Sequence, residues 1–438
     1  MSCLLRGVSP VGAPARDVLV DGGVIAALGT QLDAPQGTEV IDAAGLVLLP
    51  GLVDLHTHLR EPGREDAETV TSGSAAAALG GFTCVHAMAN TDPVADNAEI
   101  VEQVARLGEH AGLVDVRPVG AVSKGLAGQQ LAEIGNMARS AARVRIFSDD
   151  GRCVHDALLM RRALEYVKPF DAVIAQHAQD PRLADHAACA HEGEVSGRLG
   201  LAGWPAVAEE SIIARDVMLA EHTGSRLHVC HVSTAGGVEV IRWAKTRGIA
   251  VTAEVTPHHL LLSCELLDGY DPLFKVNPPL RPREHVDALR AGLADGTIDA
   301  VATDHAPHAP HDKDHAFGDA AFGVLGLQTA LGVVTAAMVE TGLLDWAGVA
   351  DRMSVRPAVI GRLSGHGRPL AQGEPANLTL VDPAGSYLVD PTALASRSRN
   401  TPFAGITLPG RVVATFLRGR ATVLDGALRE PSRTGAGV

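Results

Sequence analysis

The chain has 438 residues, a formal net charge of −14 and a hydrophobic fraction of 46%. That length suits one large barrel of about 250 residues with a smaller companion domain, and the acidic balance excludes nonspecific nucleic-acid binding through clustered basic residues. No apolar run approaches the roughly 18 residues of a membrane helix, and the N-terminal MSCLLRGVSP is too short in apolar residues for a signal peptide, so a soluble cytoplasmic protein is expected.

The two ends of the chain share short β-like runs separated by Gly, Pro and Asp. The runs near the N-terminus cover 17–20, 24–28, 38–41 and 46–49, and those near the C-terminus cover 377–381, 411–417 and 421–424. We therefore expect residues 1–50 and 371–438 to form the two parts of one small composite β-sandwich domain.

Between these ends, short apolar runs alternate with longer Ala-rich segments of helical period, which is typical of βα units around a parallel sheet. Eight runs qualify as strands: 52–58, 82–88, 115–122, 144–148, 172–177, 226–232, 249–256 and 299–303. The expected fold class is therefore α/β, with a (β/α)8 TIM-like barrel over residues 51–370. The polar segment 306–317, with Pro307 and Pro310, is interpreted as a mobile loop or lid.

Six cysteines lie far apart, and no two form a C-x-x-C pair. This pattern indicates neither a zinc finger nor a thioredoxin-like redox site. We expect reduced, mostly buried thiols.

The run Asp54-Leu55-His56-Thr57-His58 ends the first barrel strand. Alternation along a strand predicts that Asp54, His56 and His58 point to one side and that Leu55 and Thr57 point to the other. Two imidazoles on one strand could then share a metal. With 19 histidines, however, chance alone supplies about one H-x-H pair, so two ordinary surface histidines remain an alternative.

Other strand candidates also end in residues that bind metals. These ends are Ser148-Asp149-Asp150, Gln176-His177, Cys230-His231 and Thr303-Asp304-His305. The carboxyl ends of barrel strands converge on one face, so five such ends predict a metal site, and imidazoles with carboxylates suit Zn²⁺ or a related ion. The residues alone leave open which of Asp149 and Asp150, and which of His228 and His231, belongs to the site, since an acid can also cap a helix.

These motifs resemble the amidohydrolase superfamily and, within it, the bacterial type I dihydroorotases. The resemblance runs from about residue 49 to residue 408. It is carried by PGLVDLHTHLREPG, AMANTDPVADN, FSDDG, QHAQD, HVCHVST, TAEVTPHHLLL, KVNPPLR, ATDHAPH, FGVLGLQTAL and SRNTPFAG.

The resemblance implies one or two Zn²⁺ ions per subunit. His56 and His58 would hold the first ion, His177 and His231 the second, and Asp150 would bridge them. Asp304 would ligate the first ion and act as the catalytic base and acid. Asp54 is expected to support the histidines without ligating.

The substrate-binding residues implied by the resemblance are His58, Arg60, Asn90, Asn277, His308, Phe322 and Gly323. Many relatives use a carboxylated lysine as the bridge, whereas the matching strand here offers Asp150. Lys124 is the nearest lysine and is interpreted as structural, because it follows the third strand rather than the fourth.

The implied activity is the reversible cyclisation of N-carbamoyl-L-aspartate to (S)-dihydroorotate in de novo pyrimidine biosynthesis, by a zinc-dependent cyclic amidohydrolase. The chemistry of that reaction assigns the free carboxylate of the substrate to the planar guanidinium of Arg60. A homodimer, and association with aspartate transcarbamoylase, are further expectations. The alternatives are a hydantoinase-like or allantoinase-like ring hydrolase, and an inactive scaffold for the transcarbamoylase.

Overall fold

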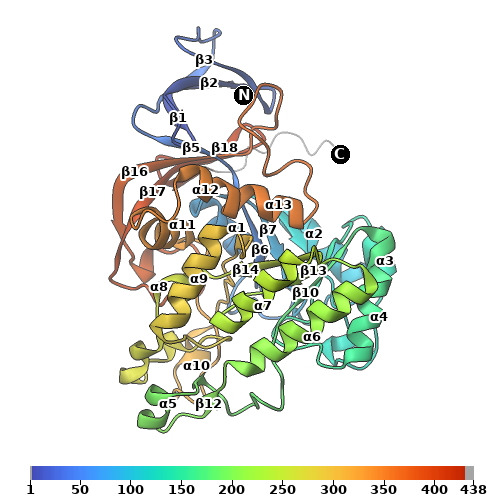
Figure 1. Cartoon of the computed structure of the whole chain (residues 1–438). Helices are drawn as coiled ribbons and strands as arrows, with labels where there is room; N and C mark the ends of the chain where they lie inside the picture. The colour runs from blue at the N-terminus through green and yellow to red at the C-terminus, as the bar shows by residue number, and fades with distance from the viewer. Residues whose placement is uncertain (1, 430–438) are drawn as a thin grey trace.

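Eight parallel strands form the centre of the structure, a computed structural model that describes residues 2–429 (Figure 1). They lie in one sheet of order β6-β7-β8 and another of order β15-β14-β13-β10-β9. Their bounds are β6 Leu52–Thr57, β7 Phe82–Ala87, β8 Asp115–Pro118, β9 Ile146–Phe147, β10 Val173–Gln176, β13 Leu227–Val229, β14 Val251–Val255 and β15 Ala300–Val301. Each lies within one of the eight runs expected from the sequence and is shorter, because the chain leaves the ladder early to form the loops beyond the strands.

The two parallel sheets meet at both edges. Gly120, two residues after β8, forms a parallel bridge with Phe147 of β9, and Thr57 of β6 forms one with His305. The His58 amide also donates a hydrogen bond to the His305 carbonyl, at 2.8 Å. The eight strands therefore close into a ring.

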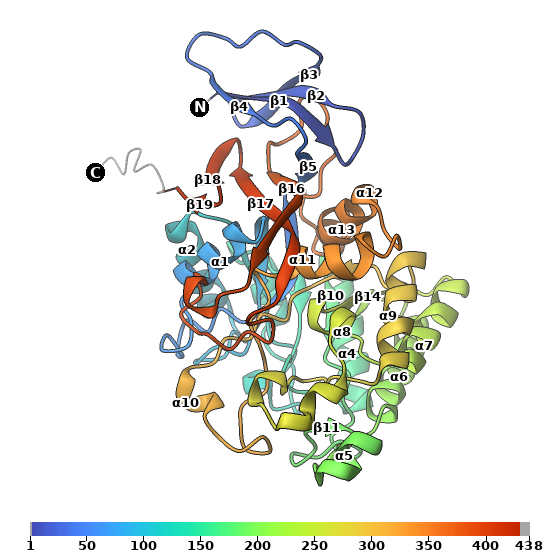
Figure 2. The ribbon, with the colours of Figure 1, turned by 90° about the vertical axis from the view of Figure 1, so that its left-hand side faces the viewer.

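Helices alternate with these strands along the chain; most cover the outside of the ring, whereas α5 and α10 lie below it in the view of Figure 1 (Figures 1 and 2). Their bounds are α1 Val70–Leu79, α2 Ala98–Ala111, α3 Ile134–Arg139, α4 Ala157–Val167, α5 Glu194–Leu199, α6 Val207–Thr223, α7 Ala235–Thr246, α8 Pro257–Leu261, α9 Arg283–Asp295, α10 Pro310–Lys313, α11 Ala330–Val334, α12 Trp346–Ala350 and α13 Arg356–Ile360. Helix α2 shows why these segments are helical: Asn97 caps its first turn, Ile100, Val101 and Val104 form its buried side, and Gly112 ends it in a left-handed conformation.

Side chains fill the interior of the ring. One buried cluster joins Leu55, Val173, Cys230 and Ala300 from strands around the ring with Ile360 at the end of α13. The expectation that Leu55 points away from the histidine side of β6 is wrong. The pairing register between β6 and β7 shifts between Asp54 and Thr57, so simple alternation does not hold across this segment.

The two ends of the chain share one nine-stranded sheet that is separate from the two parallel sheets, as the blue and red strands in Figure 2 show. Its strands are β1 Cys3–Pro10, β2 Arg16–Asp21, β3 Val24–Gly29, β4 Glu39–Asp42, β5 Val47–Pro50, β16 Leu378–Leu388, β17 Thr407–Leu417, β18 Arg420–Leu424 and β19 Ala427–Leu428. Antiparallel pairing of β5 with β16 joins the two ends, and one hydrophobic cluster holds side chains from both, such as Leu5 and Phe416. A short pair, β11 Ala190–His191 and β12 Gly203–Trp204, lies apart from both sheets.

The segment expected to be a lid contains the short helix α10. Lys313 at its end is buried and donates to the carbonyl groups of Pro272 and Ala321, at 3.0 and 2.7 Å, which ties the segment to neighbouring loops. All six cysteines are free and five are buried. Within residues 2–429, no helix combines the length and apolar character needed to cross a bilayer.

Candidate metal centre

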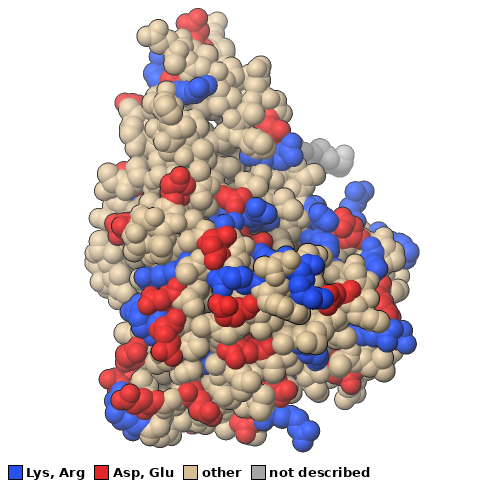
Figure 3. All heavy atoms as spheres, viewed as in Figure 1, with Lys and Arg blue, Asp and Glu red and all other residues tan. Residues whose placement is uncertain are grey.

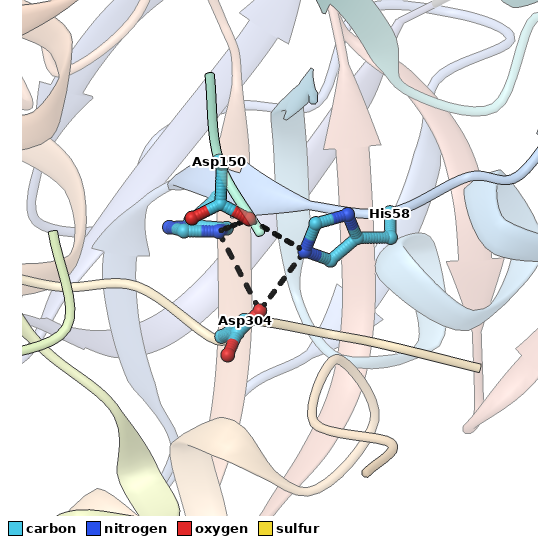
Figure 4. A group of neighbouring side chains, drawn as sticks. His58, Asp150 and Asp304 are labelled. Carbon is cyan, nitrogen blue, oxygen red and sulfur yellow. Dashed lines mark hydrogen bonds and ion pairs between the residues drawn. The ribbon is translucent and has the colours of Figure 1, made fainter. Parts of the chain in front are cut away.

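Four buried side chains from three strand ends converge in a first group (Figure 4). His56 and His58 come from β6 and the residue just after it, Asp150 follows β9, and Asp304 follows β15. The Nε2 atoms of His56 and His58 lie 3.2 and 3.3 Å from Asp150 Oδ2, and 3.5 and 3.1 Å from Asp304 Oδ1. Four candidate ligand atoms therefore face one point.

A second group uses the other oxygen of the same carboxylate. His177 Nδ1 and His231 Nε2 lie 3.3 and 3.2 Å from Asp150 Oδ1, and 3.0 Å from each other. His177 follows β10 and His231 follows β13. Asp150 thus stands between two groups of ligand atoms, each oxygen facing one of them.

The donor set fits a pair of divalent ions of the zinc type. Imidazole nitrogens with carboxylate oxygens are ligands that zinc accepts, and a shared carboxylate suits two neighbouring ions. His56 Nε2 supports this fit, because it is buried and has no partner with hydrogen-bond geometry among the described residues, although Asp150 lies 3.2 Å away. A ligand nitrogen left without a hydrogen bond is what a metal site requires.

Two further carboxylates accept hydrogen bonds from residues of this centre and orient them. Glu254 on β14 accepts from His56 Nδ1 at 2.9 Å and from His228 Nε2 at 3.0 Å, which leaves His56 Nε2 as the free nitrogen. Asp54 accepts from the backbone of His56 and Thr303, both at 3.0 Å, and so links the ends of β6 and β15. Sequence reasoning missed Glu254. Its signal was a single acid between Ala253 and Val255 in the strand VTAEV.

The structure resolves the pairs that the residues alone left open. Asp149 accepts from the amides of Val122 and Ser123, at 2.8 and 2.9 Å, and so fixes the loop after β8, while Asp150 enters the centre. His228 binds Glu254, while His231 faces Asp150. Lys124 is exposed and outside both ligand groups.

The electrostatics of the first group favour an ionised Asp304. Burial alone would raise the pKa of Asp304, but the field of His56 and the hydrogen bond and field of His58 outweigh it and bring the pKa below its usual range. Burial lowers the pKa of Arg60 to about 10, an effect that Asp304 opposes. Arg60 is therefore a cation at neutral pH beside an anionic Asp304.

Some of the residues expected to bind substrate contact this centre, either directly or through one another. Asn90 Oδ1 is 2.8 Å from His58 Nδ1. Arg60 Nε donates to the Pro307 carbonyl at 3.0 Å, and its Nη2 lies 3.4 Å from His308 Nε2. Asn277 Oδ1 is buried without a hydrogen-bond partner among the described residues, so it has an acceptor to offer.

The backbone at Phe322 and Gly323 is already engaged by protein groups. His308 Nε2 donates to the Phe322 carbonyl at 2.7 Å, and the Gly323 amide donates to the Lys275 carbonyl at 2.9 Å. Gly323 has φ of 127°, and a Cβ there would lie 2.6 Å from the Cβ of Ala306, so only glycine fits. These contacts fix the segment beside His308.

Histidines and carboxylates gathered at the carboxyl ends of a ring of parallel strands define a metal-dependent enzyme of the α/β class. A family model described as "Dihydro-orotase-like" matches residues 45–236. A dihydroorotase of Streptomyces coelicolor is 65% identical over 425 residues, which are 97% of this chain and 99% of that protein. A dihydroorotase of Mycobacterium tuberculosis is 59% identical over 430 residues, 98% of this chain and 100% of that protein. The chain belongs to the dihydroorotase family.

Solved structures with other activities share the fold. The L-hydantoinase of Arthrobacter aurescens has a TM-score of 0.86 at 24% identity, covering 98% of this chain and 97% of that one. The dihydropyrimidinase of Brevibacillus agri has a TM-score of 0.82 at 23% identity, covering 98% of this chain and 96% of that one. At this identity the likeness shows a common fold alone.

Proposed function

We propose that the chain is a zinc-dependent cyclic amidohydrolase that interconverts N-carbamoyl-L-aspartate and (S)-dihydroorotate in de novo pyrimidine biosynthesis. The observation that carries the proposal is the 65% identity to a dihydroorotase over 97% of the chain. The six candidate ligands that converge in the structure support it. Membership of the bacterial type I group within the amidohydrolase superfamily is part of the proposal. Asp150, where many relatives use a carboxylated lysine, supports it.

In this proposal His56, His58 and Asp304 would hold one ion, His177 and His231 would hold a second, and Asp150 would be shared between them. Bound zinc would supply Lewis-acid polarisation of the reacting carbonyl and a water of lowered pKa. Asp304 moves the proton. In hydrolysis its carboxylate takes a proton from the attacking water and delivers it to the leaving ring nitrogen, and in ring closure it does the reverse.

Substrate orientation is assigned to the residues beside the first group. The guanidinium of Arg60, cationic at neutral pH, binds the carboxylate that does not react, in a planar two-point contact. Asn90 and Asn277 supply neutral polar contacts, and His58 lines the same side. Burial and the nearby cations Arg60 and Lys313 lower the pKa of His308 to about 3, so its ring is a neutral hydrogen-bonding group. Phe322 and Gly323 form the backbone segment next to His308.

Substrate profiling with metal quantification tests the proposal. Purified protein is loaded with zinc, its zinc content is measured, and turnover of dihydroorotate is compared with that of hydantoin, dihydrouracil and allantoin. We expect turnover confined to dihydroorotate, with one or two zinc ions per chain. Activity confined to another ring would show a hydantoinase-like or allantoinase-like enzyme, and a metal-free inactive protein would show a scaffold.

The organisation proposed around this site is a (β/α)8 barrel over residues 51–370. Residues 1–50 and 371–438 would form the composite β-sandwich domain; residue 1 and residues 430–438 of these ranges lie outside the described part of the chain. The closed ring and the shared nine-stranded sheet support this division. A cytoplasmic homodimer, with association to aspartate transcarbamoylase, completes the proposal.

A further inference from the structure

A second cavity lies at the end of the strand ring opposite the metal centre. Its volume is about 440 Å³, and it is bordered by the start of β8, the residues just before β9, the segment after α13 and the turn between β17 and β18. The candidate metal ligands lie at the carboxyl ends of the strands, whereas Asp115 and Arg145 lie at or before the amino ends of β8 and β9. This cavity is therefore separate from the candidate active site.

Arginine dominates the charged lining of this cavity. Five arginines border it, against one carboxylate, Asp115; they are Arg117, Arg143, Arg145, Arg362 and Arg418. On the face of the molecule drawn in Figure 3, by contrast, Lys and Arg are interspersed with Asp and Glu. The concentration of arginine around the cavity is unusual in a chain whose net charge is −14.

Two of these arginines are neutralised by carboxylates and three are not. Arg362 pairs with Asp171 at 2.7 Å, and Arg418 pairs with Asp115 at 2.8 Å. For Arg117, Arg143 and Arg145, no carboxylate in residues 2–429 lies within the 4.0 Å of an ion pair. Arg117 and Arg143 are also exposed, so their guanidinium groups are available to a ligand.

The backbone supplies an independent observation. Arg143, Arg362 and Arg418 have φ of 48°, 57° and 49°, in the left-handed region that residues with a side chain rarely adopt. Residues held in this region cluster at ligand-binding sites, where the surrounding structure maintains them. Three of the five arginines of one cavity share this feature, although they come from segments far apart in the sequence.

The remaining wall can accommodate an uncharged part of a ligand. Val144, Pro118 and Leu363 line it, and His366 is held by Asp115 at 2.8 Å. His86 forms part of the same wall, and its Nδ1 donates to the Asp54 carbonyl at 2.9 Å. A volume of 440 Å³ lies in the range of small-molecule sites.

We propose that this cavity binds a small phosphate-bearing molecule, with the phosphate on Arg117 and Arg143. A guanidinium presents paired N–H donors that match the oxygens of a phosphate, which explains several arginines without carboxylate partners around one cavity. The shared chemistry is the phosphate group. Its source is inorganic phosphate, pyrophosphate or a phosphate ester such as a nucleoside monophosphate.

Calorimetric titration of the full-length, zinc-loaded protein tests this proposal. The titrants are inorganic phosphate, pyrophosphate and uridine monophosphate, at one fixed ionic strength. The test variant combines Arg117→Ala with Arg143→Ala. The control combines Arg16→Ala with Arg283→Ala, two exposed arginines on β2 and α9 that are outside the cavity and cause the same change in charge. All three proteins keep the metal centre, so phosphate binding to zinc cancels in the comparison.

We expect at least one titrant to bind the wild type and the control equally, and the test variant at least tenfold more weakly. Tighter binding of the ester than of inorganic phosphate identifies a phosphorylated metabolite as the ligand, and the reverse order identifies free phosphate. Equal affinity of test and control variants, or no binding to the wild type up to millimolar concentration, overturns the proposal. If the double variant does not fold, Arg117→Ala alone is compared with Arg16→Ala by the same criterion, with at least threefold weakening expected.

Discussion

Replacement of Glu254 tests whether the carboxylate behind the metal centre sets its affinity for zinc. Glu254 is fully buried and accepts from His56 at 2.9 Å and from His228 at 3.0 Å. Burial opposes its ionisation, but the hydrogen bonds and fields of the two histidines outweigh burial and lower its pKa to about 2. Glu254 is therefore an anion that fixes the ring of His56 with Nε2 facing the ligand group.

The size of the effect follows from the hydrogen bond that is lost. Glu254→Leu removes both acceptor oxygens at a similar side-chain size, and a hydrogen bond to a charged group contributes about 1.5–3 kcal/mol. Because each 1.4 kcal/mol is about tenfold in affinity, we expect zinc to bind about 10-fold to 100-fold more weakly. Glu254→Gln keeps one oxygen and should show a smaller loss.

Zinc affinity is measured by competition with a chelator of known affinity, and circular dichroism confirms that each variant is folded. The matched control is Asp115→Asn, which also removes a carboxylate bonded to a buried histidine, His366, but at the opposite end of the ring. It should bind zinc as the wild type does. A folded Glu254→Leu protein with zinc affinity within about threefold of the wild type would refute the role of Glu254.

Three further predictions concern substrate binding, metal removal and pH. Arg60→Lys should raise KM at least tenfold with unchanged zinc content, because an ammonium lacks the planar fork of the guanidinium; wild-type KM would remove the assignment. Chelation of zinc should abolish dihydroorotate turnover while the circular dichroism spectrum is retained, and added zinc should restore activity; turnover by metal-free protein would contradict this. At Asp115, the hydrogen bond and field of His366, together with Arg418, outweigh burial and lower the pKa to about 2, so its stabilisation is present above about pH 4 and is lost as the pH falls towards 2. Asp115→Asn should therefore lower the free energy of unfolding by about 2 kcal/mol at pH 7, and urea titrations at pH 7 and pH 3 should show the gap narrowing; an equal gap at both would contradict the reasoning.

The strands and the candidate ligand positions could be predicted from the sequence because both depend on local patterns. Each of the eight apolar runs contains a strand, and the ligand groups comprise residues from five of the predicted strand ends. Side-chain direction was less predictable at those ends. Arg60, His231 and Asp304 have φ of 61°, 32° and 47°, so the regular alternation of a strand stops just where the site begins. The residues alone did not separate His231 from His228; the family resemblance implied His231, and in the structure His231 is the one that faces Asp150.

The residues that orient the candidate ligands were the hardest part of the site to predict from the sequence. Glu254 lies within its strand and belongs to no pair or motif of metal ligands. Its role depends on the closed ring, which pairs β14 with β13 and brings the Glu254 carboxylate within hydrogen-bond distance of His56 on β6. Leu55 was misplaced for a similar reason, because a shift in strand pairing is set by contacts between strands and not by the residues of one strand. Both cases require the closed ring.

The net charge of the chain also gave no indication of the arginine-lined cavity. A net charge of −14 predicts no broad basic surface for nucleic acid, but that charge is a sum over 438 residues. The five arginines span residues 117 to 418 and become neighbours only when the turn between β17 and β18 packs against the amino ends of the strand ring. The clustered arginines attract an anion at that point, while the net charge of −14 disfavours approach of a large polyanion. The cavity therefore favours a small phosphate-bearing ligand over a nucleic acid.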